Sequence, residues 1–196
     1  MESFFAMQTE IEQRRKWDLS TRALEVLRVG GSTDLCALHG QAGDTMDVWW
    51  VVESPCWPIK HREYVMHRRL CRVTDGPSGR PLYVRVEDTG DASASRRLRS
   101  QTAPQSVRCI DFRCTQVAWA SAAEHAGTTV PGVRVRTRYR EDPMMPLPKF
   151  VVGVIIDKMI PRGLGALRKA AILREQRLVS AAQHAPQRAV SATCQH

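Results

Sequence analysis

Apolar and polar residues alternate along much of this chain, most regularly between Gly132 and Arg140. Successive side chains of a strand point to opposite faces, so this period of two predicts a strand with one apolar and one cationic face. The apolar positions are Val133, Val135, Thr137 and Tyr139, and the cationic positions are Arg134, Arg136, Arg138 and Arg140. The cationic face is either simply solvated or a contact surface for an anionic membrane.

Further stretches rich in β-branched and aromatic residues predict strands at 23–29, 47–53, 62–73, 82–86 and 107–118. Asp75-Gly76-Pro77-Ser78-Gly79 predicts a hairpin turn, and 122–129 predicts another turn. The small, polar and basic residues of 90–105 indicate a mobile loop.

Helical spacing occurs at both ends of the chain. Phe4, Met7 and Ile11 recur at intervals of three and four, which predicts an amino-terminal helix that ends before a turn at 17–21. A long helix is expected from Lys149, with a kink or restart at Pro161. The order of elements predicts an α+β fold, in which a curved antiparallel sheet wraps on a long C-terminal helix.

The 196 residues suit one domain over 1–175, followed by a polar tail at 176–196 that we expect to be disordered. No window reaches the roughly 18 apolar residues that a spanning helix needs. Met1-Glu2-Ser3 lacks the basic start of a signal peptide, which predicts a cytoplasmic protein.

The formal charge of +9 favours anionic partners, either phospholipid headgroups or nucleic acid. The 6 cysteines are dispersed without a CxxC pair, so we expect reduced thiols and no zinc site. Neither G-x-S-x-G nor H-E-x-x-H occurs, and the sequence indicates no cofactor and no enzyme activity.

Three segments resemble START domains, nearest to the phosphatidylcholine-transfer branch. Arg14-Arg15-Lys16-Trp17-Asp18 is similar to the family's R-x-x-W-D helix end, and Trp57-Pro58 through Val65 is similar to its P-W-P-x-x-x-R-D/E-Y-V segment. The third segment runs from Asp142-Pro143 through Leu164. The resemblance implies a helix-grip fold that holds one phospholipid in an internal cavity, closed by the C-terminal helix.

The resemblance also implies the site residues. Arg14 and Asp18 match cavity residues of the choline-binding members, and an arginine suits a buried phosphodiester; the alternative is a surface ion pair. An aromatic cage for choline would come from Trp49 or Trp50, Tyr64 and Phe112, which are otherwise ordinary core residues. Met145 and Phe150 would lie at the start of the lid, or simply pack on the sheet.

The chain begins almost at the R-x-x-W-D helix, so we expect the amino-terminal part of the family fold to be missing, leaving an unpaired sheet edge. A non-transferring lipid sensor or membrane-surface module is therefore an alternative to a transfer protein. Arg62 and Glu63 are expected to form a structural ion pair. We expect a monomer that contacts an anionic membrane peripherally.

Two other functions are weaker. A helix-grip enzyme would need titratable groups in its cavity, and the only clustered candidates are His61, Glu63 and His67. Nucleic-acid binding would use the arginine stripe and a basic loop, but no groove-reading helix or stacking platform accompanies them. The loop residues are Arg96, Arg97 and Arg99.

Overall fold

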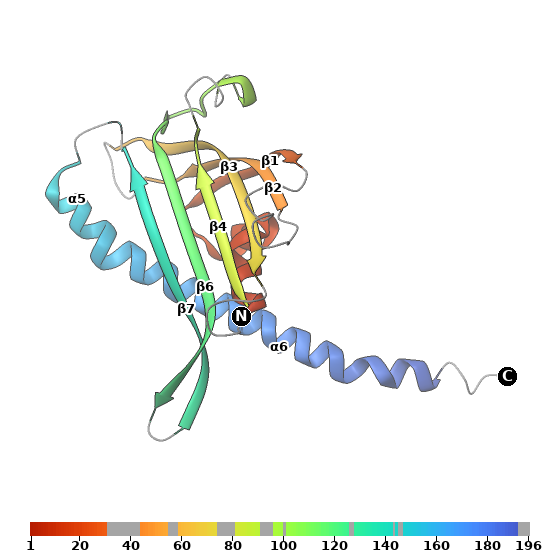
Figure 1. Ribbon diagram of the computed structural model, residues 1–196. Coiled ribbons are helices and arrows are strands. Elements are labelled where there is room, and N and C mark those ends of the chain that lie inside the picture. Colours follow the sequence, from red (N-terminus) through yellow and green to blue (C-terminus); the bar gives the residue numbers. More distant parts are fainter. Residues whose placement is uncertain are drawn as a thin grey trace.

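The computed structural model has an α+β architecture with a curved antiparallel sheet and a long C-terminal helix (Figure 1). It describes residues 1–30, 44–54, 59–73, 81–90, 96–99, 101–125, 128–142, 144 and 147–191, with backbone alone at 122–125, 128–131 and 184–191. Pro55-Cys56-Trp57-Pro58 and Met145 therefore lie outside the described residues.

The described sheet has seven strands, and its main path runs in the order β1-β2-β3-β4-β6-β7. These are β1 (Thr21–Gly30), β2 (Asp44–Val52), β3 (His61–Val73), β4 (Leu82–Asp88), β6 (Phe112–His125) and β7 (Thr128–Glu141). The short β5 (Ser106–Arg108) pairs in parallel with β3, whereas all the other pairs are antiparallel. The predicted strands are present, except that the single strand expected at 107–118 is divided into β5 and β6. The strands β1 and β7 lie at opposite ends of the path.

The hairpin of β6 and β7 is longer than the sequence predicted. The chain reverses within the expected turn at 122–129, but the connection is shorter than predicted, because β6 runs to His125 and β7 begins at Thr128, with Glu124 paired to Thr129. Alanine and serine at 120–123 weakened the strand signal, but the ladder to β7 satisfies their backbone groups.

The two faces of the sheet carry separate apolar clusters. The helix-side face holds Leu24, Val48, Tyr64, Met66 and Phe112, against which Ile11 packs. The outer face holds a second cluster of Trp49, Val51 and Val65, covered in part by Leu98 and Ala103. Because both faces of β3 are covered, its run from Glu63 to Met66 is buried without interruption.

The amino-terminal helices α1 (Glu2–Thr9) and α2 (Ile11–Trp17) lie between the sheet and the C-terminal helix (Figure 1). Phe5 packs on Tyr83 and Ala118 of the sheet, with the Phe5 and Tyr83 ring centroids 4.7 Å apart. Met7 packs instead on the far side, against Leu167 and Ala171. The short α1 therefore connects the sheet to the C-terminal helix.

The C-terminal helix comprises α5 (Lys149–Val154), a π-helical turn η1 (Ile155–Met159) and α6 (Ile160–Ser191). Proline cannot donate a backbone hydrogen bond, so the wider turn that precedes Pro161 is the local irregularity expected from the sequence. The helix α6 continues to Ser191, while 192–196 lie outside the described residues. The disorder expected for the tail at 176–196 stays a prediction. Of the segments that contact it, α1 makes the most extensive contact with α6.

Glu63 is fully buried on the outer face and holds the segment before β6 against the sheet. Its carboxylate accepts hydrogen bonds from Trp49 Nε1 at 2.7 Å, Ala103 N at 3.1 Å and Arg108 at 3.0 Å. The predicted Arg62–Glu63 ion pair is therefore wrong, because neighbouring strand residues point to opposite faces and Glu63 pairs with Arg108.

The described part of the predicted mobile loop at 90–105 is attached to this outer face. The Arg99 guanidinium lies 3.6 Å from the Trp49 ring centroid, and Arg108 donates to the carbonyls of Arg99 and Gln101. These contacts attach the described residues of the segment to the sheet, partly through backbone carbonyl groups. The mobility expected from the polar composition stays a prediction.

We expect Glu63→Ala to lower the free energy of unfolding by about 3 to 5 kcal/mol, because it leaves Arg108 and the Trp49 indole nitrogen without their acceptor. Urea unfolding followed by tryptophan fluorescence measures the change. The exposed Glu12→Ala is the matched control and is expected to alter stability by less than about 0.5 kcal/mol. Equal stabilities of the two variants would contradict this role.

Candidate functional site

Arg14 and Asp18 lie on one side of the turn that ends α2. Arg14 Nε donates to Asp18 Oδ2 over 3.1 Å, and Asp18 also accepts from Ser20 N at 3.2 Å and Ser20 Oγ at 2.6 Å. The predicted pair at i and i+4 is thus formed. It is not a surface pair, because Arg14 is only 8% exposed.

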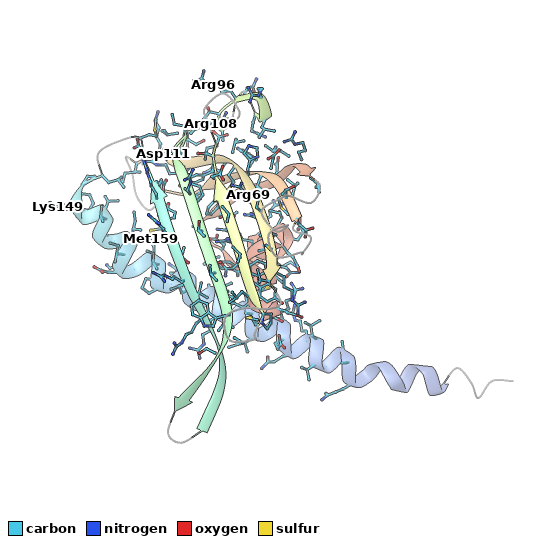
Figure 2. All side chains as sticks on the ribbon, viewed as in Figure 1. Arg69, Arg96, Arg108, Asp111, Lys149 and Met159 are labelled. Atoms are coloured by element: carbon cyan, nitrogen blue, oxygen red, sulfur yellow. The ribbon has the colours of Figure 1, made fainter. Side chains whose placement is uncertain are left out.

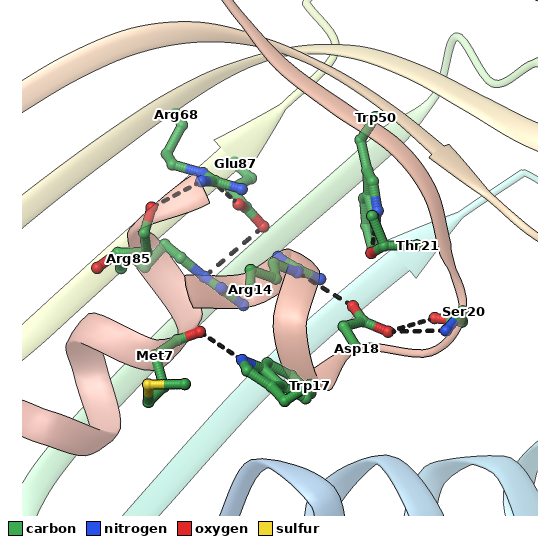
Figure 3. A network of polar contacts seen from close by, with 11 residues as sticks. Met7, Arg14, Trp17, Asp18, Ser20, Thr21, Trp50, Arg68, Arg85 and Glu87 are labelled. Atoms are coloured by element: carbon green, nitrogen blue, oxygen red, sulfur yellow. Dashed lines mark hydrogen bonds and ion pairs between the residues drawn. The ribbon is translucent and has the colours of Figure 1, made fainter. Parts of the chain in front are cut away.

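Arg14 joins two arginines and a glutamate from the sheet (Figure 3). Arg68 Nε of β3 donates to Glu87 Oε1 of β4 at 2.7 Å, while Arg85 Nε lies 3.6 Å from Glu87 Oε2. Arg68 also donates to the Thr9 carbonyl at the end of α1, over 3.2 Å. We call Arg14, Arg68, Arg85 and Glu87 the guanidinium cluster.

Arg68, Arg85 and Glu87 were not predicted from the sequence as site residues. A signal was present in β4, where Tyr83, Arg85 and Glu87 alternate with Val84 and Val86. Period two places the arginine and the glutamate on one face. In the structure the face of β4 with the charged residues is the buried one, whereas Val84 and Val86 on the other face are only partly buried.

Burial and like charge determine the ionisation of this cluster. Burial alone would raise the pKa of Glu87, but the guanidinium groups of Arg85, Arg68 and Arg14 lower it to about 2. Burial lowers the pKa of Arg68 to about 10, although Glu87 opposes the change. Burial also lowers the pKa of Arg14, and the neighbouring Arg85 contributes to that fall.

Several buried nitrogens of the cluster have no hydrogen-bond acceptor within the described structure. They are Arg14 NH1, Arg68 NH2 and both Nε and NH1 of Arg85. Buried donors of this kind are rare in native proteins and call for a physical explanation, such as a bound anion or water. The cluster therefore offers donors to an anion.

Four aromatic rings continue from Arg14 across the helix-side face. The Arg14 guanidinium lies 4.1 Å from the Trp50 centroid, and the centroid distances are 5.3 Å from Trp50 to Tyr64 and 5.0 Å from Tyr64 to Phe112. Tyr139 follows at 5.5 Å from Phe112 and was not predicted as a site residue. Of the two tryptophans, Trp50 lies on this helix-side face, because the Trp49 indole nitrogen donates to Glu63 on the outer face.

The far end of this aromatic row carries Glu141. Tyr64 Oη donates to Glu141 Oε1 over 2.6 Å, and Tyr139 Oη donates to Glu141 Oε2. Burial and this carboxylate raise the pKa of Tyr64. Burial likewise raises the pKa of the Cys109 thiol to about 12, so this thiol stays protonated at neutral pH.

A pocket of about 590 Å³ borders Asp18 and runs along the C-terminal helix. Its apolar lining comes from Ile155, Met159, Ile160, Leu164 and Leu167 of η1 and α6. Gln8 and Trp17 complete the wall on the α1 and α2 side. The volume lies within the range of small-molecule sites, and the pocket joins an apolar wall to a few polar groups at one end.

Phe150 lies outside the lining of this pocket. Its ring is 68% exposed at the start of α5, so it packs on neither the sheet nor the pocket wall. Figure 2 shows Lys149 and Met159 along the same helical segment. The structure therefore joins Arg14, Asp18, Trp50, Tyr64 and Phe112 in one region and leaves Trp49 and Phe150 apart from it.

The candidate catalytic residues of β3 do not assemble into one group. His67 bonds Asp47, and His61 accepts from Ser54 N at 3.0 Å, while Glu63 is enclosed by Trp49 and Arg108. Four residues of strand separate Glu63 from His67, a distance of about 13 Å. Their separation does not favour acid–base chemistry.

The arginine stripe of β7 is exposed, as the alternation predicted, whether it is simply solvated or contacts an anionic membrane. Its opposite face is less covered than expected, because Tyr139 is 57% exposed there. Arg140 pairs with Asp111 at 3.0 Å. The sheet thus remains open at its β7 end.

Comparison with protein-family models and with curated proteins gave no match for this chain. Of the helices that the structure describes, none combines the length and apolarity needed to cross a bilayer.

The pKa of Glu87 generates a prediction for acid stability. Its folded value of about 2 lies below the ordinary 4.5, so ionised Glu87 stabilises the fold above pH 4.5, and this contribution is lost as the pH falls towards 2. The expected loss is roughly 3 kcal/mol. Urea unfolding between pH 5 and pH 2 measures it.

The Glu87→Gln variant is expected to be less stable at neutral pH and to show a shallower decline over that window. Glu12→Gln, on the exposed face of α2, is the control and should follow the parent profile. Parallel profiles for the parent protein and Glu87→Gln would contradict the assignment.

Proposed function

We propose that this chain binds a single phospholipid, with its acyl part along the C-terminal helix and its phosphate at Arg14. The observation that carries the proposal is the 590 Å³ pocket, whose apolar helical wall meets Asp18, the carboxylate that pairs with the buried Arg14. An amphiphile needs this combination of a long apolar surface and a localised polar end.

The polar end suits a phosphate group. Arginine offers a planar fork of donors, and charge-assisted bonds to phosphate are among the strongest in proteins. Asp18 holds Arg14 Nε, while Arg14 NH1 has no acceptor within the described structure. The guanidinium is therefore oriented by one partner and retains a donor for a ligand.

We assign the fold to the helix-grip class and the chain to the START domains as part of the same proposal. The R-x-x-W-D segment ends α2, the described part of the second segment enters β3, and the third begins the C-terminal helix. An antiparallel sheet with a long C-terminal helix across one face supports this assignment (Figure 1).

The C-terminal helix has the properties of a lid. α6 is held to α1 through Leu167 and Ala171, but several apolar side chains in α5, in η1 and in the first part of α6 remain exposed. They are Phe150, Ile156, Ile160 and Leu164. The π-helical turn η1 provides a local break at which α5 can move relative to α6.

Lys149 and Lys158 are exposed on the same helical segment as this apolar surface, and the arginines of β7 are exposed as well. Apolar side chains beside basic ones favour peripheral binding to an anionic membrane. A lid that contacts the membrane would load and release the lipid there. The uncovered β7 end, where Tyr139 is exposed, favours a lipid sensor as the second candidate.

The first test is native mass spectrometry of the purified chain, followed by lipid extraction. We expect one phospholipid per chain and a loss of at least half of it in Arg14→Ala, because the phosphate loses a charge-assisted partner. Arg15→Ala, the next residue on α2 and exposed, is expected to retain the parental load. An unchanged load in a folded Arg14→Ala protein would refute the phosphate role.

The apolar wall is tested with two leucines of α6. Leu164 lines the pocket and is 59% exposed, whereas Leu173 is 43% exposed and lies outside that lining. We expect Leu164→Asn to reduce lipid transfer between vesicles several-fold, since it places an amide against the acyl chain. Leu173→Asn should transfer lipid at the parental rate, and equal losses in both variants would contradict the pocket assignment.

A further inference from the structure

The guanidinium cluster and its contacts contain more positive than negative charge. Three guanidinium groups, from Arg14, Arg68 and Arg85, face the carboxylates of Glu87 and Asp18. All three arginines and Glu87 are more than nine-tenths buried. Buried charges are normally paired, so an uncompensated guanidinium in this position favours an anion.

The unsatisfied donors support the same conclusion. They belong to all three arginines, so they converge on one region from α2, β3 and β4 rather than lying at a single helix end. Gln8 Nε2, another buried donor without an acceptor among the described residues, lines the pocket beside Asp18. The pocket reaches the cluster only through Asp18, which bonds Arg14, because none of the three arginines belongs to its lining.

This region is less suited to binding a positively charged headgroup. One face of the Trp50 ring already carries the Arg14 guanidinium at 4.1 Å, and the buried rings of Tyr64 and Phe112 pack against each other. The carboxylate beside them, Glu141, accepts from the hydroxyls of Tyr64 and Tyr139. A quaternary ammonium needs open aromatic faces, and these rings are engaged with one another and with Arg14.

We infer that the ligand headgroup is an oxyanion without an attached cation, such as a phosphate monoester, and that Arg85 and Arg68 complete its site beside Arg14. This inference rests on the proposed phospholipid function and departs from the choline headgroup that the family resemblance implies. A zwitterionic headgroup would leave the excess guanidinium charge in place, whereas an acidic one neutralises it.

The experiment incubates the full chain with vesicles that contain equal amounts of phosphatidic acid and phosphatidylcholine. The protein is reisolated by gel filtration, and its bound lipids are counted by mass spectrometry. We expect phosphatidic acid to be enriched over phosphatidylcholine by about tenfold, the factor that one additional charge-assisted hydrogen bond supplies. Equal retention, or a preference for phosphatidylcholine, would overturn the inference while leaving phospholipid binding intact.

Variants test whether the lipid preference comes from the guanidinium cluster or from general surface charge. Arg85→Gln keeps a polar hydrogen-bonding side chain but removes the charge, so the enrichment should fall towards unity, while Arg85→Lys should retain part of it. The exposed Arg15→Gln removes the same formal charge and should keep the full enrichment. Thermal unfolding checks that each variant is folded, and Arg14→Gln replaces Arg85→Gln if the latter is not.

A separate arm with inorganic phosphate and no lipid distinguishes a headgroup from a free anion. If neither lipid is retained but phosphate raises Tm in the parent and not in Arg85→Gln, the oxyanion site stands and the phospholipid function fails. If neither lipid is retained and phosphate has no effect, both the inference and the proposed function fail. An enrichment that survives in folded Arg85→Gln and Arg14→Gln proteins would assign the preference to the surface and overturn the inference.

Discussion

The bond between Arg68 and Glu87 lies at the centre of this structure, because helices and strands converge on it. Arg68 Nε reaches Glu87 over 2.7 Å and its terminal nitrogen reaches the Thr9 carbonyl at the end of α1. Arg14 of α2 lies in the same electrostatic environment. An ion pair with essentially no solvent exposure is stable only when its geometry is held, so it requires α1, α2 and the sheet to keep their relative positions.

Glu63 provides the corresponding interaction on the outer face. Because Glu63 and Arg68 differ by an odd number of positions along β3, their side chains project from opposite faces of one strand. Glu63 holds the segment around Ala103 and Arg108, whereas Arg68 holds the amino-terminal helices. The central strand is therefore attached to polypeptide on both sides through buried charge, and apolar packing fills the space around it.

The C-terminal helix contrasts with this centre. It is attached to the body by the packing of Met7 on Leu167 and Ala171, and by Arg174, which forms two hydrogen bonds to Glu10. Its first part presents exposed apolar side chains and a pocket wall instead of a closed interface. Large exposed apolar surfaces in monomeric proteins commonly mark binding sites. The molecule thus joins a buried polar cluster, held from several elements, to a helix whose first part presents an exposed apolar surface.

Local patterns in the sequence determined the strands, the long C-terminal helix, its irregularity near Pro161 and the pairing of Arg14 with Asp18, because each depends on spacing along the chain. Only the tertiary structure placed Trp50 and not Trp49 beside Arg14, since alternation separates two neighbours without saying which face the helices cover. It also brought Arg68, Arg85 and Glu87 together from two strands. Charged residues in a sequence ordinarily indicate a solvated face of a strand. A buried charged face can be recognised only in the folded structure, where partners distant in sequence compensate its charge.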